Sequence, residues 1–188
     1  MADLAELLKC VAARHRHLCP RQVLGARIGL AGLVALGMEP GERRLLVIVE
    51  SDGCFADGVE VATGATVGRR TLRVVDHGKT SATFVNMATG TAVRVRPRDG
   101  IRERALAHAP EERRRYFAQL QGYQRMPDEE LLLFQPVRLV RPVSDWLGRR
   151  GARTRCACCG EEIINNREIQ RENQTLCRAC AGDRYYEE

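Results

Sequence analysis

Two groups of cysteine and histidine residues in this sequence have the types and spacing of metal ligands. In the first group, His15, His17 and Cys19 alternate directly before Pro20. Alternate side chains of an extended segment point to one side, so these residues can offer two imidazoles and a thiolate to one ion. Cys54 follows a strongly apolar segment and is the natural distant partner. The pattern therefore predicts a transition-metal site in the core, with His15, His17, Cys19 and Cys54 as ligands and zinc, nickel or iron as the ion.

The same residues also permit thiolate chemistry. If Pro20 begins a helix, Cys19 is its N-cap, where the helix dipole and free N–H groups lower the pKa of a thiol. Cys19 is then a candidate nucleophile paired with a histidine, or the ligand of a catalytic metal. Candidate groups for proton transfer or substrate anchoring are Glu50, Asp57 and Lys79. The alternative without chemistry is a small buried Cys19 beside histidines in a solvated, arginine-rich turn.

The second group consists of two Cys-x2-Cys pairs near the end of the chain. Its members are Cys156, Cys159, Cys177 and Cys180. Two such pairs are typical of one Zn²⁺ held tetrahedrally by four thiolates, and Gly160 eases the turn after the first pair. Cys158 lacks the two-residue gap and is expected to be a spare thiol. Because residues 156–188 contain few large apolar side chains, we expect a structural zinc on which their folding depends.

The stretches "CACCGEEIINNR" and "LCRAC" resemble the TraR/DksA-type zinc finger. That resemblance implies a role in docking to proteins, and sometimes to nucleic acid. Residues 156–188 carry a net charge of −3, which argues against phosphate binding by the finger itself. Docking of a protein partner or dimerisation is therefore the expected use of the finger.

Composition excludes some classes of protein. The 188 residues carry a formal net charge of +6, spread along the chain, and aromatic residues make up only 5%. Few side chains can therefore stack on bases, which makes a nucleic-acid partner the weaker hypothesis. No run of about 18 apolar residues could span a membrane, and the first residues do not resemble a secretory signal. We therefore expect a cytoplasmic protein, where eight cysteines favour metal ligation or thiol chemistry over disulfides.

The elements that position these residues follow from periodicity and turn signals. Helices are predicted over 3–14, 20–36 (ending at Gly37), 52–64 (with Asp52 as cap) and 110–124. Strands are predicted over 44–50, 70–76, 80–86, 91–97 and 136–142, with residues 69–97 as an antiparallel meander. Gly25, Gly29 and Gly32 leave one face of the second helix bare, so that another backbone can approach it closely. Cys10 is expected in the core.

These elements predict an α+β fold, with N-terminal helices packed on an antiparallel sheet and a small C-terminal zinc-finger domain. The predicted domains are a core over residues 1–147, a linker over 148–155 and the four-cysteine finger over 156–188.

Several of these motifs together resemble the formylmethanofuran dehydrogenase FmdE family. The family pattern "HxHxCPG" falls on His15, His17 and Cys19. The patterns "E…C…DG…TG.T.G" and "D.GK" fall on Glu50, Cys54, Asp57, Gly58, Thr63, Gly64, Thr66, Gly68, Asp76, Gly78 and Lys79. The resemblance implies an α+β core with an antiparallel sheet, a cysteine/histidine metal site, frequent dimerisation and an appended zinc domain.

The chain departs from the family pattern at three positions. Ala65 stands where many members have a cysteine, and Arg16 and Arg21 replace glycines. Without a cysteine at position 65, the core ligand set is reduced, and redox chemistry between cysteines at 54 and 65 is not available.

These observations favour a dimeric metal-binding accessory protein. The alternatives are an enzyme that uses a Cys19 thiolate or a catalytic metal, and a regulatory protein or nucleic-acid binder that acts through the finger and the basic linker.

Overall fold

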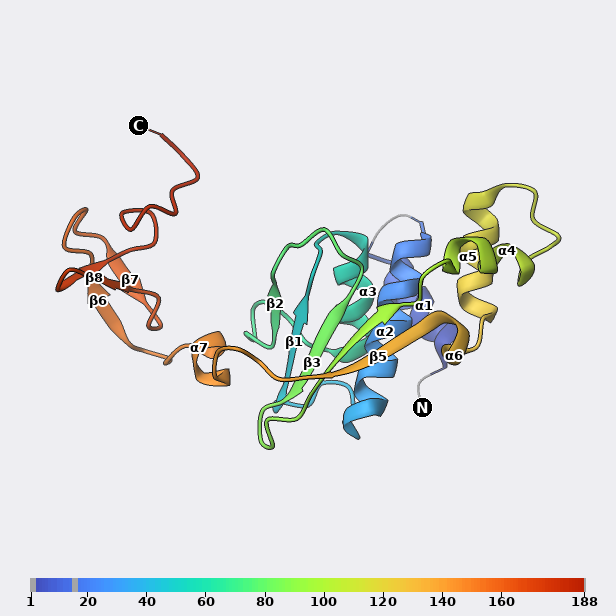
Figure 1. Ribbon diagram of the computed structural model, residues 1–188, viewed down its shortest axis with the longest axis horizontal. Coiled ribbons are helices and arrows are strands. Elements are labelled where there is room, and N and C mark those ends of the chain that lie inside the picture. Colours follow the sequence, from blue (N-terminus) through green and yellow to red (C-terminus); the bar gives the residue numbers. More distant parts are fainter. Residues whose placement is uncertain (1–2, 15–16, 188) are drawn as a thin grey trace. The chain divides into compact units, whose positions relative to one another are not determined.

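The computed structural model describes residues 3–14 and 17–187, which form two compact units (Figure 1). The first unit extends to Arg138 and the second begins at Leu139. Each has its own cluster of buried apolar residues. The mixture of helices with a mainly antiparallel sheet confirms the predicted α+β class, while the predicted domain bounds stay predictions. In the described part of the chain, no helix is long and apolar enough to cross a membrane.

The helices of the first unit begin and end at local sequence signals. They are α1 (Leu4–Ala12), α2 (Pro20–Leu36), α3 (Cys54–Thr63), α4 (Ile101–Ala107), α5 (Arg115–Arg125) and α6 (Asp128–Leu131). The side chain of Asp3 caps α1, and Gly37 ends α2 in the left-handed conformation, with φ of 61°. Helix α2 therefore has its predicted bounds. Cys10 was wrongly expected in the core: it lies on the outer face of α1 and is exposed.

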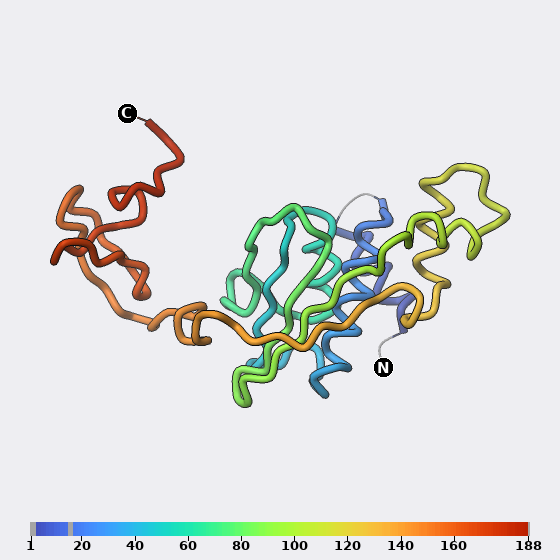
Figure 2. The backbone as a smooth tube through the Cα atoms, in the orientation of Figure 1, coloured from blue at the N-terminus to red at the C-terminus, as the bar shows by residue number. Residues whose placement is uncertain are grey.

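Five strands form the sheet of the first unit in the order β2-β1-β3-β4-β5. Their bounds are β1 (Leu45–Val49), β2 (Leu72–Val74), β3 (Ala82–Asn86), β4 (Ala92–Pro97) and β5 (Leu132–Val137). Strands β3, β4 and β5 are antiparallel neighbours, and Figure 2 shows β5 returning along β4. Strand β5 lies at the edge of the sheet, where Pro136 is tolerated because one side of the strand needs no partner.

The predicted antiparallel meander over residues 69–97 is wrong for its first strand. Strand β2 pairs with β1, and in parallel, with Val47 opposite Leu72. β1 lies between β2 and β3, so the turn at His77-Gly78 does not close a hairpin. The segment instead crosses the end of β1, where the carbonyl of Glu50 accepts hydrogen bonds from the backbone N–H groups of His77 and Lys79. Parallel pairing requires a crossover, which α3 provides.

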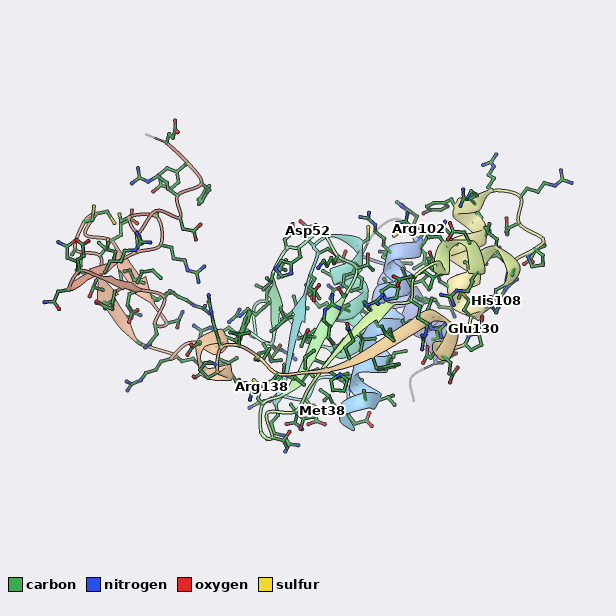
Figure 3. The ribbon with its side chains drawn as sticks, in the orientation of Figure 1. Met38, Asp52, Arg102, His108, Glu130 and Arg138 are labelled. Atoms are coloured by element: carbon green, nitrogen blue, oxygen red, sulfur yellow. The ribbon has the colours of Figure 1, made fainter. Side chains whose placement is uncertain are left out.

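Two further boundaries differ from prediction. The helix expected over 110–124 begins at Arg115, because a turn in which the N–H of Glu112 donates to the carbonyl of Ala109 separates it from α4. The strand expected over 136–142 is β5, which ends at Val137. Helix α4 ends at His108, whose ring nitrogen lies 2.9 Å from the carboxylate of Glu130, and Figure 3 shows both side chains between α4 and α6.

Helices α2 and α3 pack in parallel and very closely. A Cβ added to Gly25 would lie 2.2 Å from the carbonyl oxygen of Phe55, and one added to Gly58 would lie 2.4 Å from the carbonyl of Gln22. Further along both helices, a Cβ on Gly29 would lie 2.6 Å from the Cβ of Ala62. The prediction that this glycine face receives another backbone is therefore confirmed. Because contacts advance in the same direction along both helices, their N-termini lie at the same end.

Arg27 is the one charged residue within the apolar helix α2 that joins this helix to α5. Its Nη1 donates to the carbonyls of Tyr123 (2.7 Å) and Met126 (2.6 Å), and Nη2 pairs with Asp128. Carbonyls at a helix C-terminus lack partners within the helix and carry partial negative charge. The guanidinium therefore caps α5 from a neighbouring helix.

The second unit contains one short helix and two small hairpins. Its elements are α7 (Val143–Leu147), β6 (Arg153–Arg155), β7 (Glu162–Ile164), β8 (Ile169–Arg171) and β9 (Gln174–Leu176). Strand β6 pairs with β7, and β8 pairs with β9. Each hairpin leads into or contains one of the two cysteine pairs.

Candidate metal centres

The two core cysteines occupy equivalent places at the starts of α2 and α3. Cys19 is the N-cap of α2, with extended backbone (φ −125°, ψ 160°), and Pro20 begins the helix as predicted. Cys54 is the first residue of α3. The predicted cap Asp52 is wrong, because Gly53 takes that position with φ of 65°, and Figure 3 shows Asp52 in the loop before the helix. The parallel packing of the helices brings both cysteines to one end.

The thiols of Cys19 and Cys54 are hydrogen-bond partners. Cys19 is buried and Cys54 is half-buried. Burial raises the pKa of the Cys54 thiol above its ordinary value, and its contact with Cys19 raises this pKa further. The N-termini of two helices act in the opposite direction, because their free N–H groups and dipoles favour negative charge. The pair therefore suits a positive ion that relieves the repulsion between two thiolates.

Gln22 lies one turn into α2 and is completely buried. Its Oε1 accepts a hydrogen bond from the backbone N–H of Cys19 at 2.9 Å. Within the described part of the chain, its Nε2 has no hydrogen-bond acceptor. Unpaired buried donors are rare and costly, so this amide favours negative charge near the start of α2.

The histidines predicted as ligands are not brought to this pair. His17 is exposed, and among the described residues it does not form a close group of ligand atoms with Cys19 and Cys54. His15 lies outside the described residues. The four-ligand core site therefore stays a prediction, of which the structure brings together the two cysteines.

Asp57 lies on the first turn of α3, near the N-terminus shared with Cys54. Its carboxylate lies 3.9 Å from Nη1 of Arg14, which also pairs with Glu60 at 2.8 Å. These contacts tie the residues after α1 to α3.

Glu50 follows β1 and is buried in a polar network on the sheet. Its carboxylate accepts from Nε (2.5 Å) and Nη2 (2.7 Å) of Arg94 and from the hydroxyl of Ser81 (2.9 Å). Arg94 also donates to Gln135 on β5 at 2.7 Å. These hydrogen bonds, from Arg94 above all, hold the pKa of Glu50 below its ordinary value despite burial. Glu50 is therefore a charged acceptor that joins β1 to β3, β4 and β5.

Lys79, the third auxiliary candidate, is exposed in the segment that follows β2. Its backbone N–H donates to the carbonyl of Glu50 at 3.1 Å. The backbone of Lys79 therefore supports the end of β1, and its side chain faces solvent.

Tyr116 on α5 is a residue that sequence reasoning missed. Partial burial, followed by the nearby charges of Cys19 and Cys54, raises the pKa of its phenol. Its ring also makes an edge-to-face contact with Phe117, with centroids 5.3 Å apart. The only local signal was an aromatic pair after three arginines, which says nothing of the distant cysteines.

The four predicted cysteines of the second unit lie together. The Sγ atoms of Cys156, Cys159, Cys177 and Cys180 all lie within 4.8 Å of one another, and this is the one such group of three or more metal-ligating residues in the described ranges. Four thiolates at about 2.3 Å from a tetrahedral ion have sulfur–sulfur distances just inside this limit. The cluster could therefore bind a metal such as zinc.

The two cysteine pairs are held by the same backbone turn. The N–H of Gly160 donates to the carbonyl of Cys156 at 3.0 Å, and that of Ala181 donates to the carbonyl of Cys177 at 2.9 Å. Gly160 has φ of 75°, as its predicted role in the turn requires. The N–H of Cys177 also points at the sulfur of Cys156, at 3.3 Å.

Backbone N–H groups lower the pKa of the Cys156 thiol to about 6, chiefly those of Cys159 and Cys177. The neighbouring sulfurs act on Cys180 in the opposite sense: hydrogen bonding with Cys177, followed by burial, raises its pKa. Four crowded thiols do not ionise together in water, whereas a bound cation makes all four thiolates favourable.

An α+β unit with paired cysteines at two helix N-termini, joined in sequence to a four-cysteine cluster, defines a two-unit protein with metal-ligating sites. Residues 14–133 match the family model described as "FmdE, Molybdenum formylmethanofuran dehydrogenase operon". The chain belongs to the FmdE family.

The solved structure of an FmdE-like protein of tungsten formylmethanofuran dehydrogenase, from Syntrophus aciditrophicus, is similar to this chain. The TM-score is 0.59 and the sequences are 21% identical, over 99% of this chain and 96% of the other. This likeness shows a shared fold.

A curated relative from Archaeoglobus fulgidus is described as a probable S-adenosyl-L-methionine-binding protein. It is 38% identical over 100 residues, which is 50% of this chain and 27% of the relative. The chain thus matches about a quarter of the length of that relative.

Proposed function

We propose that this protein is a metal-binding accessory protein of the FmdE type, with a structural zinc in the second unit and a transition metal bound in the first. The observation that carries the core site is the contact between the Cys19 and Cys54 thiols at the N-termini of two parallel helices.

Cys19 and Cys54 supply two soft ligands, which suit zinc, nickel or iron better than magnesium. His17, together with His15, supplies the remaining ligands or leaves a position open for a small molecule. The unpaired amide of Gln22 fits this proposal, because it favours a site with negatively charged ligands. A metal bound there would polarise a ligand at an open position.

The zinc of the second unit has a structural role. Four protein ligands leave no open position on a tetrahedral ion. The buried apolar residues of this unit are few: Cys156, Ile163, Leu176 and Ala181. So small a core needs a metal to hold two short hairpins together.

A second candidate function is catalysis by a core thiolate or a core metal. The position of Tyr116 favours it, since a phenol near both cysteines can exchange protons with a bound substrate. Turnover with any substrate, lost in Cys19→Ser, would establish this function.

The test of the core site is the metal content of the full chain, measured by elemental analysis after purification without chelators. We expect about two ions per chain, falling to about one in the Cys19→Ser, Cys54→Ser double variant. Cys10→Ser is the matched control, because Cys10 is an exposed cysteine outside both clusters.

The double variant separates the two sites. If it keeps the metal content of the native chain, the core proposal is wrong. Loss of the ion from the second unit through Cys177→Ser should leave the core ion in place. Light scattering on the same samples tests the homodimer, which we propose from the family resemblance.

A further inference from the structure

The second unit contains a pocket that the proposed metal sites do not explain. Its volume is about 540 Å³, within the range of small-molecule sites. One wall is α7 with the residues on either side of it, and the other is the segment that leads into β8. This inference concerns the second unit alone and does not rest on the core metal site.

Arginines dominate the lining of this pocket. They are Arg141, Arg149, Arg167 and Arg178. Asp145 and Glu168 also line it, so the lining carries a net charge of +2. Within the described part of the chain, none of the four guanidiniums has a carboxylate oxygen within 4.0 Å, although two acidic residues share the pocket with them. Four unpaired arginines therefore converge on one space.

Short-range contacts fix the walls of the pocket. Arg167 donates from Nη2 to the carbonyl of Trp146, at 3.1 Å, which anchors one guanidinium to α7. Gly148 ends α7 so close to Asn165 that an added Cβ would lie 2.2 Å from the carbonyl oxygen of Asn165. Arg178 lies within the second cysteine pair, directly after Cys177. The arginines are thus carried on segments whose backbones are held in place.

We propose that this pocket binds the phosphate group of a small phosphate monoester, of the size of a mononucleotide. Guanidinium groups hydrogen-bond phosphate oxygens in pairs, and a phosphate monoester carries a charge of about −1.5 to −2 that matches the lining. Leu147 and Ile169 line the same pocket and contact the uncharged body of the ligand. Asp145 and Glu168 disfavour a ligand with many phosphates, because a polyanion would bring excess negative charge against them.

The test is calorimetric titration of the full, metal-loaded chain with adenosine monophosphate as the probe. Inorganic phosphate, adenosine and a single-stranded oligonucleotide are the comparison ligands. We expect adenosine monophosphate to bind more tightly than inorganic phosphate, and adenosine not to bind. In Arg149→Gln, the affinity should fall about tenfold, because a charged hydrogen bond is lost.

Arg150→Gln is the matched control, since it removes the same charge from the adjacent, exposed residue, which does not line the pocket. Unchanged metal content and far-ultraviolet circular dichroism show that the variants are folded. Equal losses in both variants would overturn the proposal, because they would indicate diffuse attraction instead of a site. So would inorganic phosphate binding as tightly as the monoester, or no binding of the monoester at about 1 mM.

The oligonucleotide distinguishes the other class of partner. Binding of the oligonucleotide that exceeds that of the monoester, with a salt dependence indicating several phosphates, would refute a small-molecule pocket in favour of a nucleic-acid surface.

Discussion

Replacing Gly25 with alanine should separate α2 from α3. The new Cβ would lie 2.2 Å from the carbonyl oxygen of Phe55, and such contacts are essentially never below 3.0 Å. The helices must therefore move apart by at least about 0.8 Å, because the obstructing atom is backbone and cannot rotate away. A gap of this size removes about a quarter to a half of each neighbouring dispersion contact.

The expected loss of stability follows from two opposing effects. Overpacking of a tight interface costs about 1–3 kcal/mol, and occasionally more where both sides are backbone. Alanine recovers about 1 kcal/mol through its higher helix propensity. Because Gly29 and Gly58 make similarly close contacts, separation at Gly25 disturbs the whole interface. We expect a net loss of about 2 kcal/mol in the free energy of unfolding.

Urea unfolding followed by circular dichroism at the helix band measures this loss, since the long helices belong to the first unit. The single tryptophan, Trp146, belongs to the second unit, and its fluorescence should be unchanged. Gly68→Ala is the control, because its added Cβ meets no atom within 4 Å. If Gly25→Ala unfolds at the same urea concentration as Gly68→Ala, the reasoning about close packing is refuted.

Three further outcomes are expected. Arg27→Met should lower the free energy of unfolding by about 2–4 kcal/mol, since it leaves carbonyls of α5 without their donor, whereas the exposed Arg43→Met should change it by less than about 0.5 kcal/mol. Glu50 has a pKa lowered by folding, so its contribution is present above its ordinary value of 4.5 and is lost as the pH falls below it; urea midpoints should show this acid loss in the native chain and not in Glu50→Gln. Stripping metal with a strong chelator should shift Trp146 fluorescence and leave the helical circular dichroism of the first unit intact, and loss of both signals together would contradict separate metal-dependent folding of the second unit.

Local signals predicted α2 and the four-cysteine cluster well. Pro20 and Gly37 mark the ends of α2, and two Cys-x2-Cys pairs define a ligand set without reference to the rest of the chain. In both cases, the residues that determine the structure are marked by short patterns in the sequence. The family resemblance was confirmed over residues 14–133.

The features that escaped prediction depend on distant partners. Strand β2 has an ordinary strand sequence, and only the crossover through α3 decides that it pairs in parallel with β1. Glu50 looked like a loop residue, because its partner Arg94 lies 44 positions away on β4. The approach of Tyr116 to the cysteines depends in the same way on the packing of α5, which no short pattern encodes.

The parallel, glycine-mediated contact of α2 and α3 also limits how this sequence can vary in length. The cysteines and the glycine contacts share the same two helices, so the distance along the chain from Cys19 to Gly25 is a fixed helical phase. One residue inserted between them would rotate everything after it by about 100°, which would turn Gly25 away from α3 and present a side chain in its place. Insertions in this family member should therefore be tolerated in the loops and excluded between the cysteine and the glycine, even though no residue between the two need be kept.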